Sequence, residues 1–276
     1  MRMSKHLKDK AFKKIFVASD FHSLFLDKRA FEVFLACYTE NDADELILNG
    51  DILDLPMLMR ADKQKIYGRG DVPTFTFLEE VEFTIENILE PLRKAKKHCP
   101  ILYKIGNHES RAINILRGNS PGLEELVEAG IRKDRMRFES LLELDRLGIE
   151  LSFGEEGTGV DFRRMRGTRA AILHGVKTNA NRLQANLRYY LCSGTSGHTH
   201  KMSSAEMPYY GGTFRWVESG CLRTIHNVEY MPHGADPGWQ HGFVTIWQHK
   251  DTGQTFVKGH EISNYRVEFH GEEYKA

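Results

Sequence analysis

Polar side chains of three types, Asp, Asn and His, follow short apolar runs along this chain. They are Asp20 and His22, Asp51, Asn107 and His108, His174, and His198 and His200. Side chains alternate between two faces of an extended segment, so Asp20 and His22 can point the same way, as can His198 and His200. Each pair can then hold one site. These oxygen and nitrogen donors suit Mn²⁺, Fe or Zn²⁺ better than an all-oxygen Mg²⁺ or Ca²⁺ cage.

A donor set of this size can hold two cations. Two divalent ions about 3.5 to 4 Å apart repel each other strongly, so a carboxylate that bridges them is useful, and Asp51 is the candidate. Two carboxylates and neutral imidazoles leave such a cluster positively charged. That charge attracts a phosphate and lowers the pKa of a metal-bound water, so that hydroxide can attack phosphorus near neutral pH.

The apolar runs before these residues predict the elements that position them. The β-branched run KIFVAS at 14–19 predicts a buried strand that stops at Asp20, and 45–48 and 100–105 predict strands that stop before Asp51 and Asn107. Residues 27–38 have apolar positions at helical spacing, and 74–97 have helical periodicity with an interruption at Pro91. The pattern is that of a β-α-β unit whose strands end in ligand-type residues.

The second half of the chain is rich in predicted strands. They are 149–153, 170–173, 190–193, 214–217, 243–247 and 255–258. The segment 110–147 is mostly helical and basic in pattern, with turn signals at 118–122, and we expect an insertion that shapes the site. No repeat, low-complexity tract or linker marks a boundary, so we expect one domain over 1–276, with two sheets and helices outside.

Composition narrows the class of protein. The chain has 276 residues, 41% of them apolar and 28% charged, and its formal net charge is zero, so the overall charge indicates no polyanionic partner. No stretch is apolar enough for a membrane span, and the start is polar rather than signal-like, so we expect a soluble, cytoplasmic protein. The four cysteines are far apart and form no Cys-x-x-Cys pair, which predicts buried, reduced thiols. Oligomeric state is not indicated.

Five short blocks carry a resemblance to a known family. They are Asp20-Phe21-His22, Gly50-Asp51-Ile52-Leu53-Asp54, Gly106-Asn107-His108-Glu109, Leu173-His174-Gly175 and Gly197-His198-Thr199-His200. Together and in this order they resemble the signature blocks of calcineurin-like metallophosphoesterases. The segments 218–222 and 239–243 make the chain similar to members encoded by bacteriophages and prophages, which are often given a suggested role in DNA processing. The resemblance implies a four-layer α/β/β/α sandwich.

The resemblance also implies roles. Asp20, His22 and His200 would bind one metal ion, Asn107, His174 and His198 the other, and Asp51 would bridge the two. His108 would stabilise or protonate the leaving oxygen, and Asp54 would orient His108. Asn107, His108 and Arg111 would contact the substrate. Mn²⁺ is the ion we expect first, with Fe, Zn²⁺ and Ni²⁺ as alternatives.

The substrate class stays open at this stage. Leu55-Pro56 follows Asp54 where Ser/Thr protein phosphatases have an Arg-Gly that clamps phosphate, although GNHESR at 106–111 resembles a protein-phosphatase segment. A phosphodiesterase or nuclease acting on DNA is therefore preferred to a phosphomonoesterase. Basic residues at 131–137 and 163–188 could contact a nucleic-acid backbone. A binding module without catalysis is the remaining alternative, but every expected ligand position is filled.

Overall fold

The computed structural model describes residues 11–56, 76–116, 138–152, 163–164, 170–175, 178–226 and 236–276, without the side chains of 111, 112, 114–116, 163 and 164. Its larger sheet has the strand order β11-β10-β1-β2-β3-β4. The strands are β1 (Phe12–Ala18), β2 (Glu45–Asn49), β3 (Ile101–Lys104), β4 (Ile149–Ser152), β10 (Gly242–His249) and β11 (Thr255–Glu261). Strands β1 to β4 are parallel neighbours, whereas β10 is antiparallel to both β1 and β11.

A second sheet has the order β5-β6-β7-β9-β8. Its strands are β5 (Arg163–Arg164), β6 (Ala170–Leu173), β7 (Ser193–Ser196), β8 (Ser204–Tyr209) and β9 (Gly212–Glu218). The neighbours β6, β7 and β9 are parallel, and β8 and β9 form an antiparallel hairpin. A small separate hairpin joins β12 (Arg266–Phe269) to β13 (Glu272–Lys275).

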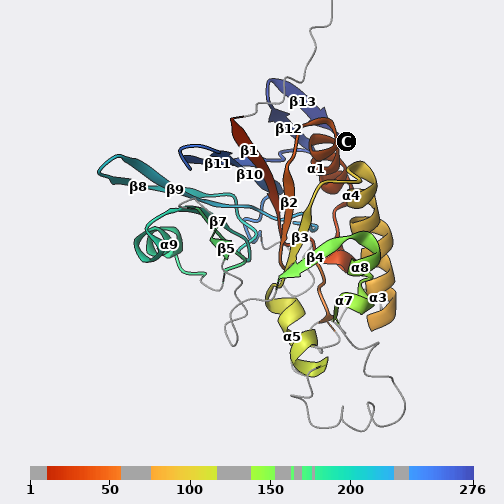
Figure 1. Ribbon diagram of the computed structural model, residues 1–276. Helices are drawn as coiled ribbons and strands as arrows, with labels where there is room; N and C mark the ends of the chain where they lie inside the picture. Colours follow the sequence, from red (N-terminus) through yellow and green to blue (C-terminus); the bar gives the residue numbers. More distant parts are fainter. Residues whose placement is uncertain are drawn as a thin grey trace, which may run out of the picture.

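Alternation along the strands sorts the buried side chains into three cores. In β1, Ile15 and Val17 face the second sheet, whereas Phe16 and Ala18 lie in the core under the helices. Strand β6 likewise directs Ile172 toward the first sheet and Leu173 toward helix α9 (Arg182–Tyr190). Because both sheets bury both faces, the order of layers is helices, sheet, sheet, helix, and the predicted α/β/β/α sandwich is confirmed (Figure 1).

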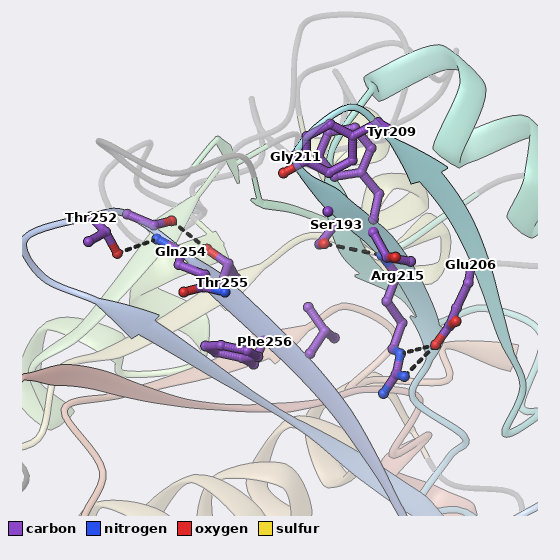
Figure 2. A pocket seen from close by; sticks show the side chains of 14 residues that line it. Ser193, Glu206, Tyr209, Gly211, Arg215, Thr252, Gln254, Thr255 and Phe256 are labelled. Atoms are coloured by element: carbon purple, nitrogen blue, oxygen red, sulfur yellow. Dashed lines mark hydrogen bonds and ion pairs between the residues drawn. The ribbon is translucent and has the colours of Figure 1, made fainter.

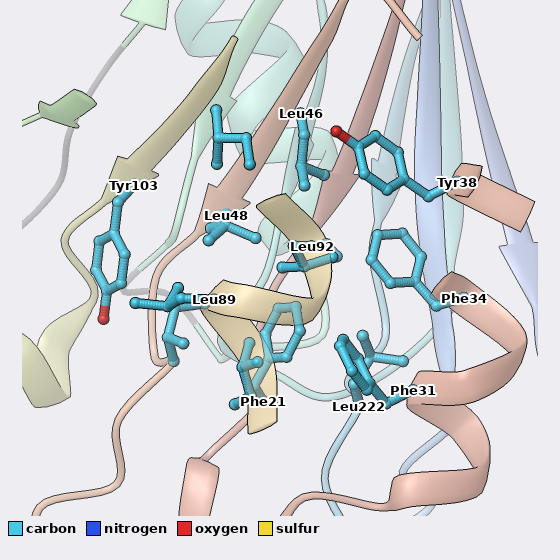
Figure 3. Packing of buried hydrophobic residues seen from close by; sticks show 14 of the residues in the cluster. Phe21, Phe31, Phe34, Tyr38, Leu46, Leu48, Leu89, Leu92, Tyr103 and Leu222 are labelled. Carbon is cyan, nitrogen blue, oxygen red and sulfur yellow. The ribbon is translucent and has the colours of Figure 1, made fainter. Parts of the chain in front are cut away.

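The largest core lies between the first sheet and its helices, and Figure 3 shows part of it. Helix α1 (Lys28–Glu40) buries Phe31, Phe34 and Tyr38 there, which is the face that the helical spacing predicts. The helix begins at Asp27, whose carboxylate accepts the backbone N–H of Ala30 at 3.1 Å.

The long helical run before β3 is divided into α3 (Phe77–Thr84), a π-helical turn η3 (Ile85–Leu89) and α4 (Glu90–Ala95). Thr76 and Glu79 form a capping box at its start. Pro91 lies in the first turn of α4, and the N–H of Glu90 bonds to the carbonyl of Ile85, five residues earlier. Pro91 has no N–H, so it cannot donate the i to i−4 hydrogen bond of an α-helix. The helix therefore widens to a π-helical turn just before Pro91.

One predicted strand is wrong. Tyr190 ends helix α9, Leu191 follows in a left-handed conformation, and the strand that was expected at 190–193 is instead Ser193–Ser196. Local β-propensity gave way to tertiary packing, because Leu183 and Leu187 of α9 share a core with Trp216 of the second sheet. Of the hairpin β8–β9 only the second strand was expected, at 214–217, and the hairpin β12–β13 was not expected.

The segment 110–147 is helical where it is described. Helices α5 (Asn107–Leu116), α7 (Phe138–Leu141) and α8 (Leu144–Leu147) belong to it, while 117–137 lie outside the described residues. Among the described residues no helix is long and apolar enough to cross a membrane. All four cysteines are free and buried, as predicted.

His260 of β11 makes the fold sensitive to acid. Burial, with Lys258 and His270 nearby, lowers the pKa of His260 to about 3, and its Nε2 lies 2.8 Å from the hydroxyl of Thr245. The unfolded chain therefore takes up a proton below pH 6.5 that the folded chain refuses, and stability falls with decreasing pH.

We expect this group alone to remove about 2 kcal/mol of unfolding free energy between neutral pH and pH 5. Urea unfolding at both pH values measures this decrease in unfolding free energy. In His260→Gln the decrease between the two pH values should be smaller by about 2 kcal/mol. His98→Gln, at an exposed position, is the control. An unchanged pH dependence in His260→Gln would contradict this account.

Candidate metal centre

The loops that follow β1, β2, β3, β6 and β7 meet at one edge of the two sheets. The N–H of Asp20 bonds to the carbonyl of Gly50 at 3.0 Å, and that of His22 to the carbonyl of Asp51 at 3.0 Å, so the first two loops lie side by side. The N–H of His198 donates to the carboxylate of Asp20, which joins the two sheets at this edge. Parallel strands thus bring polar residues far apart in sequence to one place.

The backbone at these residues is not extended. Asp20, His22, Asp51, His198 and His200 all have positive φ values, between 45° and 72°. Strand alternation therefore cannot be what directs these side chains. The expectation that each pair holds one site is correct for Asp20 and His22, but it is wrong for His198 and His200, which point into different clusters. Non-glycine residues with positive φ are costly and are held by surrounding structure, which is a recurrent feature of functional sites.

Two clusters of donor atoms form at this edge. In the Asp20 cluster (Asp20, His22, His200), Nε2 of His200 lies 3.1 Å from Nε2 of His22 and 3.2 Å from Oδ1 of Asp20. In the His174 cluster (Asp51, Asn107, His174, His198), Nε2 of His174 lies 3.0 Å from Oδ2 of Asp51 and 3.1 Å from Oδ1 of Asn107. Oδ1 of Asn107 is 2.8 Å from Nδ1 of His198. His198 and His200 thus join different clusters.

Asp51 lies between the clusters. The same Oδ2 that is 3.0 Å from His174 is 4.0 Å from Nε2 of His22. Its other oxygen accepts the backbone N–H of His108 at 2.9 Å, which holds the carboxylate in place. One carboxylate oxygen therefore faces both sets of nitrogen atoms.

Hydrogen bonds turn ring nitrogens toward the clusters. Nδ1 of His174 donates to the carbonyl of Asn49 at 2.8 Å, so its Nε2 carries the lone pair in the neutral ring. Nδ1 of His22 donates to Oδ1 of Asp54 at 2.6 Å, with the same consequence. This is the outer arrangement that metal-binding histidines have in proteins.

The two buried carboxylates of the clusters need positive charge close by to stay ionised. Asp20 and Asp51 are 0% and 1% exposed. Burial alone would raise the pKa of Asp20, but His174 and His200 lower it to about 2. Burial opposes the charge of His174 in turn, yet Asp51 and Asp20 raise the pKa of His174 to about 10. Burial lowers the pKa of His22 to about 4 despite its bond to Asp54, so this ring stays neutral, as a ligand must.

These residues fit divalent cations. Ligand atoms about 2.1 Å from one ion lie roughly 3.0 to 3.4 Å apart at angles of 90° to 110°. Four separations in the two clusters lie between 3.0 and 3.2 Å. Cations placed in the clusters would also supply the charge that a proton on His174 otherwise provides. The donor set thus suits divalent metal ions in chemistry, spacing and charge.

Asp54 and His108 contact each other in an unexpected way. Nδ1 of His108 donates to the backbone carbonyl of Asp54, whereas the Asp54 carboxylate lies 3.8 Å from that nitrogen. The carboxylate instead binds His22, and Arg223, which is 1% exposed, approaches it to 3.9 Å. Asp54 therefore orients His108 through its main chain and His22 through its side chain.

Two buried glutamates organise the site, and no role was assigned to either from sequence. Glu109 follows the expected pair Asn107 and His108, and its carboxylate accepts backbone N–H groups of Asp51, Ile52 and Leu53. Glu80 of α3 does the same for Asp54 and Leu55. A signal existed for Glu109, which belongs to a quoted block. For Glu80 there was none, since an isolated Glu in a helix reads as a solvated residue.

The expected nucleic-acid contacts are only partly described. The side chain of Arg111 and the basic residues at 132–137 and 166–169 lie outside the described residues. Arg182 is bound to Glu218, with its Nε 2.5 Å from a carboxylate oxygen, so its charge is already paired. His241 belongs to neither cluster, and its Nε2 lies 2.9 Å from the carbonyl oxygen of Arg223.

A separate hollow of about 810 Å³ lies between the β8–β9 hairpin and the turn after β10. Figure 2 shows Tyr209, Arg215 and Phe256 around it, with Arg215 bound to Glu206. None of the metal-cluster residues lines it.

Comparison with known proteins gives distant relatives. No family model matches the chain. It is 26% identical over 241 residues to the Gene 54 protein of Mycobacterium phage L5, covering 85% of this chain and 88% of that protein. Its identity to the Gene 54 protein of Mycobacterium phage D29 is 27% over 238 residues, covering 84% and 87%.

Solved structures of similar shape are more distant still in sequence. Vps29 of Entamoeba histolytica complexed with Zn²⁺ has a TM-score of 0.44 and 12% identity, covering 95% of this chain and 98% of that one. Vacuolar Protein Sorting 29 of Cryptosporidium parvum has a TM-score of 0.42 and 10% identity, covering 97% and 100%.

The close approach of loops at Gly106 can be tested. A Cβ there would lie 2.2 Å from Oδ1 and 2.3 Å from the backbone nitrogen of Asp51. Gly106→Ala should therefore lower the unfolding free energy by about 3 kcal/mol, as overpacking of a rigid site does. Gly271→Ala, where φ is +81° and no atom lies within 4 Å, should cost about 1 kcal/mol. Equal losses of unfolding free energy in the two variants, measured by urea unfolding, would show that the loops at Gly106 and Asp51 are not closely packed.

Proposed function

We propose that this chain is a dinuclear-metal-dependent phosphoesterase of the calcineurin-like metallophosphoesterase class. The observation that supports it most is the position of one oxygen of Asp51 between the two donor clusters, 3.0 Å from His174 and 4.0 Å from His22. A single bridging carboxylate between two sets of nitrogen and oxygen ligands is the arrangement that a two-metal hydrolase needs. The α/β/β/α sandwich agrees with this class, but a fold alone does not define an activity.

The ligands follow from the clusters. Asp20, His22 and His200 would hold one ion, and Asn107, His174 and His198 the other, with Asp51 between them. When bound, two divalent cations polarise the phosphoryl oxygens and supply hydroxide near neutral pH. Mixed oxygen and imidazole donors favour Mn²⁺, with Fe, Zn²⁺ and Ni²⁺ as alternatives.

His108 is the residue proposed to act on the leaving group. Its Nδ1 must carry a proton because the carbonyl of Asp54 can only accept. Nε2 lies on the other side of the ring, 3.9 Å from Oδ2 of Asp51, and so faces the space between the clusters. A proton on Nε2 could therefore pass to the leaving oxygen of a phosphoester bound there.

A phosphodiester, with DNA as the preferred example, is the substrate class that we propose. The residue after Asp54 is Leu55, which is fully buried, so no clamping cation stands at that position. A diester carries one negative charge where a monoester carries two, and it depends less on such a clamp. The relatives are phage proteins, which supports action inside a bacterial host cell. A phosphomonoesterase remains the second candidate.

Hydrolysis of two aryl esters tests this proposal. The Mn²⁺-loaded protein should cleave an aryl phosphodiester faster than the matching monoester. Asp51→Asn should lower kcat/KM at least about 10³-fold, because it removes the charge shared by both ions. His108→Ala should lower kcat about 10² to 10⁴-fold. Preference for the monoester would favour a phosphatase, and inertness with every candidate metal would contradict the catalytic proposal.

Metal counting tests the ligand assignment separately. Wild type should bind two Mn²⁺ per chain in equilibrium dialysis. His198→Ala and His200→Ala should each lose or weaken one ion, since these two residues face different clusters. Their double substitution should weaken both. His249→Ala, on β10, is a control outside both clusters, and two intact ions in both single variants would refute the assignment.

A further inference from the structure

Five consecutive backbone amides, from residue 51 to residue 55, donate to two buried carboxylates. Glu109 accepts the first three at 2.7 to 3.1 Å. Glu80 accepts the N–H of Asp54 at 2.6 Å and that of Leu55 at 3.1 Å. Both glutamates are 0% exposed. The loop that carries Asp51 and Asp54 is therefore fixed by side chains from α5 and α3 and not by a regular strand.

This loop needs such support. Asp51 and Leu55, at its two ends, have φ values of 52° and 54°, which non-glycine residues rarely adopt. Its N–H groups point away from the strand ladder, and without an acceptor they would be buried and unsatisfied. A carboxyl group offers two oxygens with several acceptor sites, so each glutamate can satisfy two or three of these N–H groups and hold one of the two strained residues, Glu109 at Asp51 and Glu80 at Leu55.

Glu80 also holds the neighbouring loop. The hydroxyl of Ser23 donates to Oε1 of Glu80 at 2.9 Å. Ser23 follows His22, whose ring donates to the Asp54 carboxylate at 2.6 Å. Oε1 of Glu80 thus binds both the Ser23 hydroxyl and the backbone N–H of Asp54. In this way Glu80 holds the two loops that carry His22 and Asp54 at the distance their hydrogen bond requires.

We propose that Glu80 is a positioning residue for the Asp20 cluster. It acts through Asp54: by holding the Asp54 main chain it places the carboxylate that orients His22 and the carbonyl that orients His108. Glu80 lies in none of the five blocks from which the site was predicted. The inference rests on the proposed function, because it assigns a role toward the ions that the clusters would hold.

Removal of Glu80 should affect the two clusters unequally. Outer-sphere partners of metal-binding histidines typically contribute 10- to 100-fold in metal affinity. The Asp20 cluster contains His22 and so depends on Glu80, whereas His174 is oriented by the carbonyl of Asn49. The His174 cluster should therefore keep its ion when the first is weakened.

Isothermal titration with Mn²⁺ tests the proposal. Wild type should bind two ions, and Glu80→Ala should bind one with near wild-type affinity and the other 10- to 100-fold more weakly. Glu80→Gln, which keeps one carbonyl oxygen for Asp54 and Ser23, should recover most of that loss. Glu79→Ala is the matched control, because Glu79 is the adjacent residue of α3 and only closes the capping box with Thr76.

Ser23→Ala is a milder variant that tests the proposal even if Glu80→Ala does not fold. It removes only the hydroxyl bond to Glu80 and should weaken the same ion about threefold or more, with circular dichroism unchanged. Unaltered binding of both ions in folded Glu80→Ala, or equal weakening of both, would overturn the proposal. If wild type binds two ions but cleaves no phosphoester, the catalytic proposal fails while the role of Glu80 in metal binding stands.

Discussion

Two carboxylates, Asp20 and Asp51, lie almost without solvent at the edge where the strand ends of both sheets meet. Ionised groups are buried at a large cost unless opposite charge and hydrogen bonds surround them. Here imidazole rings from both sheets surround the two carboxylates, and the backbone N–H groups of His108 and His198 donate hydrogen bonds to them. His22, His174 and His200 each bring a ring nitrogen to within 4.0 Å of one of these two carboxylates.

The same requirement explains the unusual backbone of the loops. Left-handed residues such as His22 and His200 let the chain turn sharply after a strand and still direct a ring into the cluster. Their cost is offset by hydrogen bonds between loops and by the carboxylates of Glu80 and Glu109. Hydrogen bonds from outside the clusters thus hold the loops that carry the donor atoms.

Much of the sandwich was predictable because it depends on local patterns. The runs before Asp20, Asp51 and Asn107 are apolar on both faces, and such runs belong in sheets that are covered on both sides. Strand 190–193 was the error, because Tyr favours strands on average, whereas here Tyr190 ends a helix that packs on Trp216. The residues of the two clusters were also named in advance, while their roles as ligands stay a prediction.

The sequence alone determined which residue types stand at the ends of strands, and therefore that oxygen and nitrogen donors would gather at one edge. Residue type and spacing left open how these residues divide between two sites; the resemblance of the five blocks implied one division, and the tertiary structure shows how the side chains are grouped. His198 and His200 are two positions apart yet face different clusters, and the Asp54 carboxylate binds His22 in preference to His108. Glu80 was invisible from sequence for the same reason. Its partners are backbone amides, which every residue possesses, and only folding brings five of them to two carboxylates.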